Sequence, residues 1–294
     1  MVKIVSIVGI TSSGKSGLAL ELAKFFDGEI VSADSRQIYC DMNYCTGKET
    51  PEELASVRHH LIDILSPNEL FNLADYQKRA YEAIDDIAKR NKLPILCGGT
   101  GLYVRSVTKG YDLSAAGIDE AKRQKLLSMS REELLALLKD YGIENVDKQK
   151  SIRHLVRMVE KAEVGDTKEK PNKPKYDVLE LGIKWTRSEI YARIEKRLDE
   201  RLPHIITEVK QLLDGGVTRE FMHRMGLEAK MATEYIDGKY ASYDEFRNEL
   251  LKEERHFAKR QDTWFKKDTN TIWIDGNSDY ISAAKELIQK FLEK

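Results

Sequence analysis

The stretch Val2–Ser16, at the start of the sequence, constrains the fold more than any other. An apolar run, Ile4–Val8, leads into Gly9, four spacer residues and Gly14-Lys15-Ser16, which is the G-x4-G-K-S phosphate-binding loop. The glycines let backbone N–H groups point at an anion, the lysine adds a positive charge, and the serine hydroxyl is placed to bind Mg²⁺. The residues expected to hold phosphate are Gly9, Thr11, Ser12, Ser13, Gly14, Lys15 and Ser16, with Ser16 also the expected metal ligand. The motif predicts binding of a di- or triphosphate and leaves the reaction open.

Predicted strands and helices alternate along the chain. Apolar runs predict strands over residues 4–8, 29–33, 93–97, 178–185 and 271–275. Helical spacing predicts helices over residues 17–26, 73–90, 187–202, 205–213, 221–231, 242–266 and 278–294. This alternation is typical of a parallel sheet covered by helices. The predicted fold class is therefore α/β, a P-loop NTPase-like core with a mostly parallel sheet flanked by helices.

The pattern changes after Asp112, where apolar strands give way to charged helices. Helices are predicted over residues 118–141 and 148–163, and a polar, proline-containing linker follows over residues 167–175. We therefore expect residues 1–112 to form the first part of the core and residues 113–175 a helical insertion domain. Residues 176–294 are expected to complete the core with further helical segments.

The composition excludes several classes of protein. With 41% hydrophobic and 33% charged residues and no apolar run near the roughly 18 residues of a membrane span, no membrane association is expected. The first residues lack the pattern of a signal peptide, so we expect a cytoplasmic location. Three cysteines without C-x-x-C spacing support neither a disulfide framework nor a zinc site. Because the net charge is −1, a nucleic acid would have to bind a local basic surface.

Two polar turns follow predicted strands and are expected to face the crevice of the phosphate-binding loop, because ligands gather at the carboxyl ends of such strands. Asp34 follows the second strand, where it could act as a general base, bind Mg²⁺ indirectly or simply cap a turn. The third strand ends in Gly98-Gly99-Thr100, without the aspartate common in ATPases. Thr100 could place a hydroxyl near the phosphates, which favours group transfer; the alternative is an ordinary tight turn.

Basic residues cluster at two places. Arg153, Arg157 and Lys161 share one helix face in the insertion, which suits a phosphate backbone, although such a run is more often a solvated face. Lys259–Lys266 interleaves basic and aromatic residues, as RNA-binding segments do, although amphipathic helix ends look similar. The adjacent pair His59-His60 is more easily explained as structural than as a zinc site.

Taken together, these motifs resemble the tRNA dimethylallyltransferases, which transfer an isopentenyl group to an adenosine beside the anticodon. The resemblance covers most of the chain and rests on GITSSGKS at Gly9–Ser16, SADSRQIY at Ser32–Tyr39, HHLID at His59–Asp63, FNLADY at Phe71–Tyr76, PILCGGTGLYVRS at Pro94–Ser106, Arg193-Ile194 with Arg197, and AKRQDTWF at Ala258–Phe265. Phosphate-binding loops are common, but SADSRQ, GGTGLY and KRQxTWF in this order are highly specific.

The resemblance implies a reaction and a role for individual residues. Asp34 and Thr100 would be catalytic, the phosphate-binding loop would hold the diphosphate of dimethylallyl diphosphate with Mg²⁺, and the target adenosine would be flipped out of its stack. The anticodon stem-loop of tRNA is the implied partner, and a monomer is the expected state. Residues implied to contact tRNA are Asp34, Ser35, Arg36, Gln37, Thr100, Arg123, Arg153, His154, Arg157, His223, Arg224, Lys259, Arg260, Gln261, Trp264 and Lys266.

Some positions depart from the family pattern. The loop Tyr39–Lys48 lacks a usual glycine and arginine, His223 replaces an arginine or glutamine, Leu227 replaces a tyrosine and Glu228 replaces a basic residue. These departures leave open a paralogue with altered tRNA preference, or an RNA-binding protein that has lost catalysis. A small-molecule kinase that shares the phosphate-binding core is the alternative enzyme.

Overall fold

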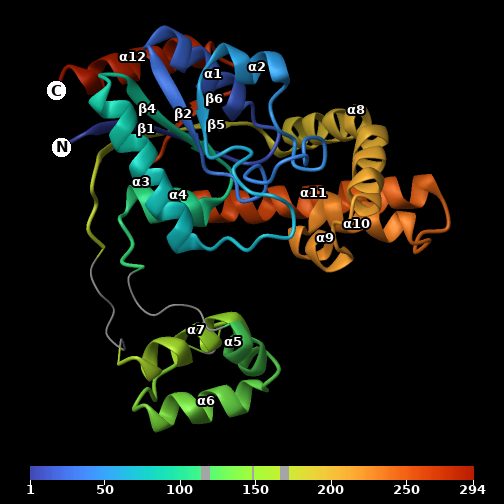
Figure 1. The fold of residues 1–294 in the computed structure, drawn as a ribbon. Coiled ribbons are helices and arrows are strands. Elements are labelled where there is room, and N and C mark those ends of the chain that lie inside the picture. Colours follow the sequence, from blue (N-terminus) through green and yellow to red (C-terminus); the bar gives the residue numbers. More distant parts are fainter. Residues whose placement is uncertain (114–119, 148, 166–171) are drawn as a thin grey trace. The chain divides into compact units, whose positions relative to one another are not determined.

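The computed structural model describes residues 1–113, 120–147, 149–165 and 172–294 (Figure 1). The start of the predicted helix 118–141, Lys148 and most of the predicted linker 167–175 lie outside the described residues. The chain divides into two compact units: unit 1 comprises Met1–Gly110 with Pro174–Lys294, and unit 2 comprises Tyr111–Lys173. The sequence had predicted the helical insertion over residues 113–175. Among the described residues, no helix combines the length and apolar character needed to cross a membrane.

Unit 1 is built on a six-stranded sheet in which every pair of neighbours is parallel. The strands are β1 (Lys3–Val8), β2 (Gly28–Ser32), β3 (His59–His60), β4 (Leu93–Gly98), β5 (Asp177–Lys184) and β6 (Ile272–Asp275). Their order across the sheet is β3-β2-β4-β1-β5-β6. The predicted α/β class with a mostly parallel sheet is thus confirmed, and β1, which leads into the phosphate-binding loop, lies in the interior of the sheet.

Helices cover both faces of the sheet because side chains of β1 alternate between them. Val5 and Ile7 face α1 (Lys15–Phe25) and α12 (Tyr280–Leu292), whereas Ile4 and Val8 face α3 (Leu73–Lys89) and α4 (Gly101–Thr108) (Figure 1). All four of these β1 side chains are fully buried. The short helix α2 (Pro51–Ser56) belongs to the loop region between β2 and β3.

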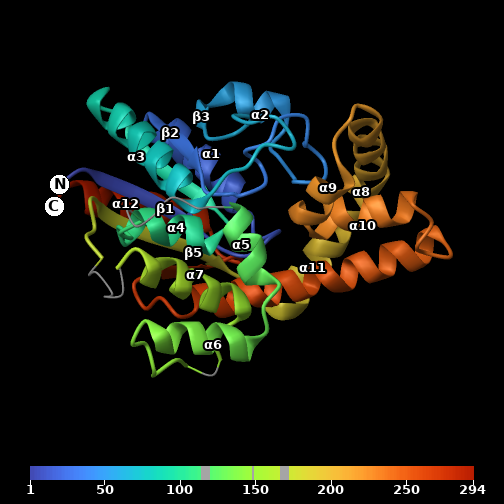
Figure 2. The same ribbon diagram turned by 60° about the horizontal axis from the view of Figure 1, so that its bottom comes forward.

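A second group of helices lies together to one side of the sheet in both Figure 1 and Figure 2. It consists of α8 (Arg187–Asp214), α9 (Arg219–Met225), α10 (Leu227–Ile236) and α11 (Tyr243–Phe265). These helices share one apolar core around Leu198, Met222 and Phe246. They supply the side chains that hold the phosphate-binding loop from outside the sheet.

Two helix boundaries in this group differ from the prediction. Residues 187–202 and 205–213 form the single helix α8, because Leu202 and Ile205 remain packed in one core on either side of Pro203. A proline inside a helix removes one hydrogen bond and bends the axis, and Figure 1 shows α8 changing direction along its length. Conversely, the predicted helix 221–231 is broken at Gly226, whose φ of 68° lies in the left-handed region.

Unit 2 has its own apolar core, formed by residues such as Leu134, Leu155 and Val159. Its helices are α5 (Glu120–Leu127), α6 (Arg131–Asp140) and α7 (Ile152–Glu163). The prediction of one helix over residues 118–141 was wrong, because Ser130 starts a new helix. Its hydroxyl accepts from Glu133 N at 3.2 Å, and the Glu133 carboxylate accepts from Ser130 N at 2.7 Å.

Candidate active site at the carboxyl ends of the strands

The phosphate-binding loop connects β1 to α1, and side chains from α8 and from Trp185, the residue after β5, hold its oxygen atoms. Trp185 Nε1 donates to Ser13 O at 2.9 Å, and Arg193 Nε donates to Ser12 O at 2.7 Å. Arg197 Nη2 donates to Thr11 Oγ1 at 2.7 Å. The sequence motif included these arginines but gave no reason for them; the structure shows that they position the loop.

A cleft of about 380 Å³ opens at this loop. Its walls are Ser12, Gly14, Lys15, Ser16, Gly47, Lys48, Glu49, Glu53, Arg193, Lys196, Arg197 and Glu200. Five of these side chains are cationic and three are carboxylates, so the cleft has an excess of positive charge. The buried hydroxyls of Ser12 and Ser13 have no hydrogen-bond partner among the described residues. Both features suit a phosphorylated ligand.

Lys15 lines this cleft, and its Nζ donates to Ile10 O at 3.3 Å. Burial lowers the pKa of the Lys15 ammonium, and Arg197 lowers it further, while Cys97, Asp34 and Glu49 oppose the shift. A cation that is poorly solvated gains more from an anionic ligand than one in water does.

The same cleft offers oxygen ligands for a metal ion. Glu49 Oε2 is buried with no hydrogen-bond partner in the described part of the chain, and it lines the cleft together with the predicted ligand Ser16. Carboxylate and hydroxyl oxygens are hard donors of the kind that Mg²⁺ prefers alongside phosphate oxygens. The residues present therefore fit Mg²⁺, and Glu49 is a candidate ligand that sequence reasoning missed.

The turns that carry Asp34 and Thr100 are hydrogen-bonded to each other, since β2 and β4 are neighbours in the sheet. Thr100 Oγ1 accepts from Ser35 N at 3.0 Å, and Thr100 N donates to Ala33 O at 3.1 Å. Asp34 Oδ1 accepts from Arg36 N at 2.9 Å, so this carboxylate does cap a turn. Its second oxygen makes no hydrogen bond within the described residues and is available for chemistry.

Gln261 of α11 lies between the phosphate-binding loop and the turn after β4, which form the two sides of the reaction crevice, and it bonds to both. Its Oε1 accepts from Thr11 N at 2.8 Å, and its Nε2 donates to Gly99 O at 3.0 Å. Gln261 is buried, so the structure places this predicted tRNA-contacting residue inside the protein as a bridge between the phosphate-binding loop and the turn after β4. Three residues further along α11, Trp264 covers Gly101 so closely that a Cβ atom there would clash with the indole ring.

An ionic cluster surrounds the buried carboxylate of Glu228. Arg36 Nη1 is 3.3 Å from Glu228 Oε2, and Arg201 Nη2 is 3.7 Å from Glu228 Oε1. Glu254 is buried with both carboxylate oxygens unpartnered among the described residues, and burial, followed by the charge of Glu228, raises its pKa to about 7. Glu228, which departs from the family pattern, thus pairs with the predicted tRNA contact Arg36.

The remaining predicted tRNA contacts fall into three places. Gln37 is buried, donating to Gly47 O at 3.2 Å. Six predicted contacts are exposed on unit 1: His223 and Arg224 on α9, Lys259, Arg260 and Trp264 on α11, and Lys266 directly after α11. Unit 2 carries Arg123, Arg153, His154 and Arg157, of which Arg123 and Arg157 pair with Glu160 at 2.6 and 3.0 Å.

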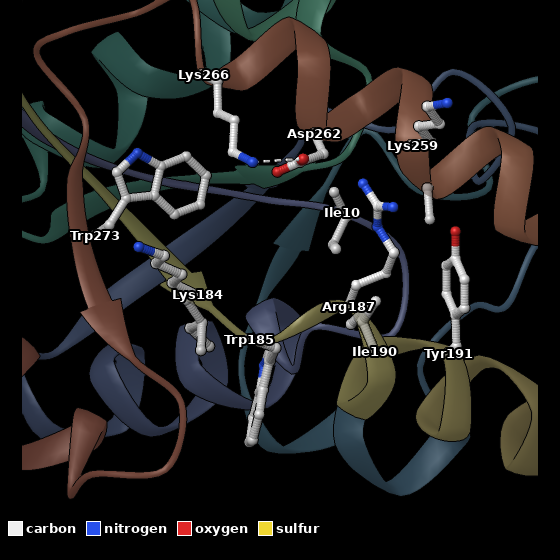
Figure 3. A pocket seen from close by; sticks show the side chains of 12 residues that line it. Ile10, Lys184, Trp185, Arg187, Ile190, Tyr191, Lys259, Asp262, Lys266 and Trp273 are labelled. Carbon is white, nitrogen blue, oxygen red and sulfur yellow. Dashed lines mark hydrogen bonds and ion pairs between the residues drawn. The ribbon is translucent and has the colours of Figure 1, made fainter.

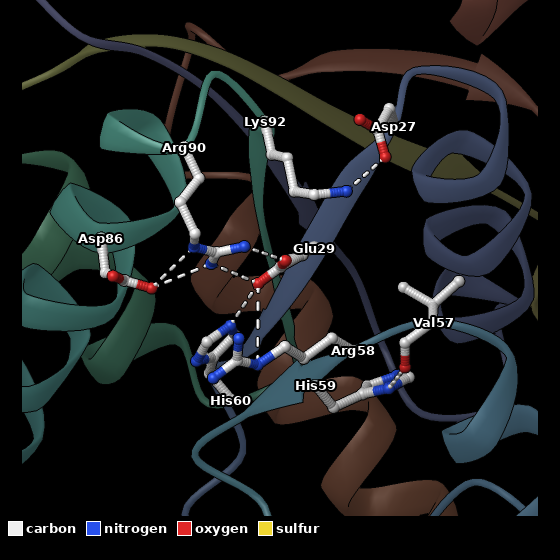
Figure 4. A network of polar contacts seen from close by, with 9 residues as sticks. All are labelled: Asp27, Glu29, Val57, Arg58, His59, His60, Asp86, Arg90 and Lys92. Carbon is white, nitrogen blue, oxygen red and sulfur yellow. Dashed lines mark hydrogen bonds and ion pairs between the residues drawn. The ribbon is translucent and has the colours of Figure 1, made fainter.

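The paired histidines form β3, beside β2, and His60 belongs to a polar network around Glu29 (Figure 4). His60 Nε2 lies 2.7 Å from Glu29 Oε2, and Arg90 binds both oxygens of the same carboxylate. The hydrogen bond from Arg90 lowers the pKa of Glu29 to about 2. The adjacent His59 instead contacts Val57 O at 2.8 Å. The network ties β2 to β3 and to the end of α3.

Comparison with known proteins identifies the family to which this chain belongs. The family model described as IPP transferase matches residues 37–268. The tRNA dimethylallyltransferase of Staphylococcus aureus strain MSSA476 is 38% identical over 92% of this chain and 92% of its own length. The tRNA dimethylallyltransferase 2 of Pelobacter propionicus is also 38% identical, over 97% of this chain and 93% of its own.

Among solved structures, the tRNA isopentenylpyrophosphate transferase of Bacillus halodurans matches with a TM-score of 0.77 and 33% identity, covering all of this chain and 97% of that one. The family model includes α11, and the match of fold covers the whole chain, including the phosphate-binding loop and the turn that holds Asp34. The chain belongs to the IPP transferase family.

Proposed function

We propose that this protein is a tRNA dimethylallyltransferase. It would transfer a dimethylallyl group from dimethylallyl diphosphate to the exocyclic amine of the adenosine 3′ of the anticodon, releasing diphosphate. What carries the proposal is that the phosphate-binding loop, which lines a cationic cleft, is bridged by Gln261 to the turn after β4. Thr100 of that turn is hydrogen-bonded to the turn that holds Asp34. The family membership agrees with this chemistry.

In the proposed reaction the cleft binds the leaving group. Lys15 and the loop backbone would hold the diphosphate oxygens, and Arg197 would remain on Thr11 to keep the loop in place. Ser16 and Glu49 would hold Mg²⁺, which neutralises charge that develops on the diphosphate. Cations aimed at that charge lower the barrier for its departure.

Asp34 would act on the other reactant. The lone pair of an adenine amine is delocalised into the ring, so the nitrogen is a weak nucleophile unless a base removes its proton. As the nitrogen bonds to the allylic carbon, the carbon–oxygen bond to diphosphate breaks and the free oxygen of Asp34 takes the proton. Thr100, tied to Ser35, would position the turn and contact the reacting centre.

The RNA partner follows from the same proposal. Arg36, Lys259 and Arg260 would meet the anticodon stem-loop, and the target base would have to leave its stack to reach Asp34. The monomeric state and the cytoplasmic location stay predictions of the sequence.

The test is incubation with radiolabelled dimethylallyl diphosphate, Mg²⁺ and unmodified tRNA, counting label in the RNA. Asp34→Asn keeps an oxygen for Arg36 N but removes the base, so the rate should fall about 10²–10⁴-fold with tRNA binding retained. Asp41→Asn, at another turn, is the matched control and should label tRNA normally. If Asp34→Asn labels tRNA at the wild-type rate, Asp34 is not the general base. No label from the wild type, with ATP-dependent phosphorylation of a small acceptor, favours the kinase; tRNA binding without either reaction favours an inactive paralogue.

A further inference from the structure

A second pocket lies beside the phosphate-binding loop, at the carboxyl end of β5 and next to Trp273 of β6 (Figure 3). Its volume is about 410 Å³, within the range of about 300–1,000 Å³ typical of ligand sites. Ile10 of the loop and Ile183 of β5 contribute apolar surface, and one face of α11 closes the pocket. Neither the proposed diphosphate site nor the Asp34 turn includes this pocket.

Helix α11 separates the pocket from the reaction crevice. Gln261 and Trp264 project towards Gly99 and Gly101 at the end of β4, as their contacts show. Ala258, Asp262 and Lys266 are spaced by four residues, so they share another face of the same helix, and this face lines the pocket. A ligand here would lie beside, and not within, the crevice that contains Asp34.

The pocket combines aromatic surface with unpaired positive charge. Trp273 of β6 and Tyr191 of α8 contribute rings from opposite sides, as Figure 3 shows. Lys184, Arg187 and Lys259 are exposed and form no ion pair within the described residues. The fourth cation of the lining, Lys266, pairs with its single carboxylate, Asp262, at 2.7 Å. The pocket therefore retains three uncompensated cations.

We infer that this pocket binds a second unpaired nucleotide of the RNA substrate, distinct from the nucleotide that is modified. The inference rests on the proposed function. A nucleobase presents flat faces that stack on rings such as Trp273 and Tyr191, while its phosphate suits the unpaired cations Lys184, Arg187 and Lys259. Since one RNA would occupy both the pocket and the crevice, each contact raises the effective concentration of the RNA at the other.

The test compares pocket variants in RNA binding and in turnover, using a synthetic anticodon stem-loop. Trp273→Ala should weaken RNA binding about 5- to 150-fold, the usual effect of one stacked base, and raise KM for RNA with little change in kcat. Trp273→Phe should recover most of the loss because it retains a ring. Lys184→Gln, at an exposed side chain, should reduce the salt dependence of binding by about one counterion. Lys290→Gln, at an exposed position of α12, is the matched control. It should change neither the affinity for RNA nor the salt dependence of binding.

The outcomes separate this inference from the proposed function. If the wild type labels tRNA, but Trp273→Ala and Lys184→Gln bind the stem-loop as the wild type does, the inference is wrong and the proposed function stands. If no protein labels tRNA, yet both variants lose RNA affinity, the pocket is an RNA site and the proposed function is wrong. Adenosine monophosphate that quenches Trp273 fluorescence without competing with the stem-loop would identify a free nucleotide as the occupant and overturn the inference.

Discussion

The bridge made by Gln261 yields a prediction whose magnitude follows from two hydrogen bonds. In Gln261→Ala, the N–H of Thr11 and the carbonyl of Gly99 both lose their partner in a buried place. Leaving one buried polar group unsatisfied costs about 1–3 kcal/mol. The free energy of unfolding should therefore fall by about 2–6 kcal/mol, which urea denaturation measures.

A second variant divides this loss between the two bonds. Gln261→Glu keeps an oxygen that can accept from Thr11 N, but it replaces the donor to Gly99 O with another acceptor. The decrease in its free energy of unfolding should therefore come mainly from the lost contact with Gly99. Gln289→Ala, at an exposed position of α12, removes the same side chain without a buried contact and should change the unfolding free energy by less than about 0.5 kcal/mol.

Kinetics test the role of this bridge in function. Because Gln261 holds the phosphate-binding loop, its loss should raise KM for dimethylallyl diphosphate more than KM for tRNA. The reasoning is refuted if Gln261→Ala unfolds as the wild type does and only KM for tRNA rises. That result would mean that Gln261 acts by touching RNA, as the family resemblance implied.

Two further predictions concern buried carboxylates. The pKa of Glu29 is lowered to about 2, chiefly by the hydrogen bond from Arg90, so its stabilising effect should be complete above about pH 4.5 and lost as the pH falls towards 2. Urea denaturation should therefore show Glu29→Gln about 3 kcal/mol less stable than the wild type at pH 7, with the difference shrinking between pH 5 and 2; a constant difference would contradict this assignment. The pKa of Glu254 is raised, so the folded protein holds a proton that the unfolded chain releases, and its stabilising effect is lost as the pH rises from about 4.5 through 7. Glu254→Gln should thus gain stability relative to the wild type between pH 5 and pH 8, and a loss over this range would show that the carboxylate is charged and paired.

The sequence predicted correctly the strands and turns that depend on residues close together in the chain. The apolar runs located the strands from β1 to β6, except the two-residue strand β3, and the order of motifs placed Asp34 and Thr100 after strands. The break before α6 had a local signal that the prediction missed, the capping pattern of Ser130 with Glu133. The continuation of α8 depends on wider context. Pro203 bends α8 without ending it because both sides of the proline stay buried in one core.

The supports of the site were harder to predict because they join residues far apart in the chain. Gln261 bonds to Thr11, 250 positions away, and Arg193 bonds to Ser12 across 181 positions. Glu49 stands in a loop with no regular pattern, and its orphaned oxygen is evident only in the folded cleft. The sequence did indicate that Arg193, Arg197 and Gln261 matter, because they belong to motifs shared with the family. It did not indicate which residues they contact.

The position of β1 in the sheet has a consequence for synthesis of the protein on the ribosome. β1 pairs with β4 on one side, but its other edge pairs with β5, in a register that sets Lys3 opposite Asp177. At about 5–20 residues per second, the roughly 170 residues between these partners take on the order of 10–30 s to translate. During that interval the strand that carries the phosphate-binding loop has an unpaired edge, which is a site for mispairing and aggregation. Slow translation between β4 and β5 should therefore lower the yield of native protein.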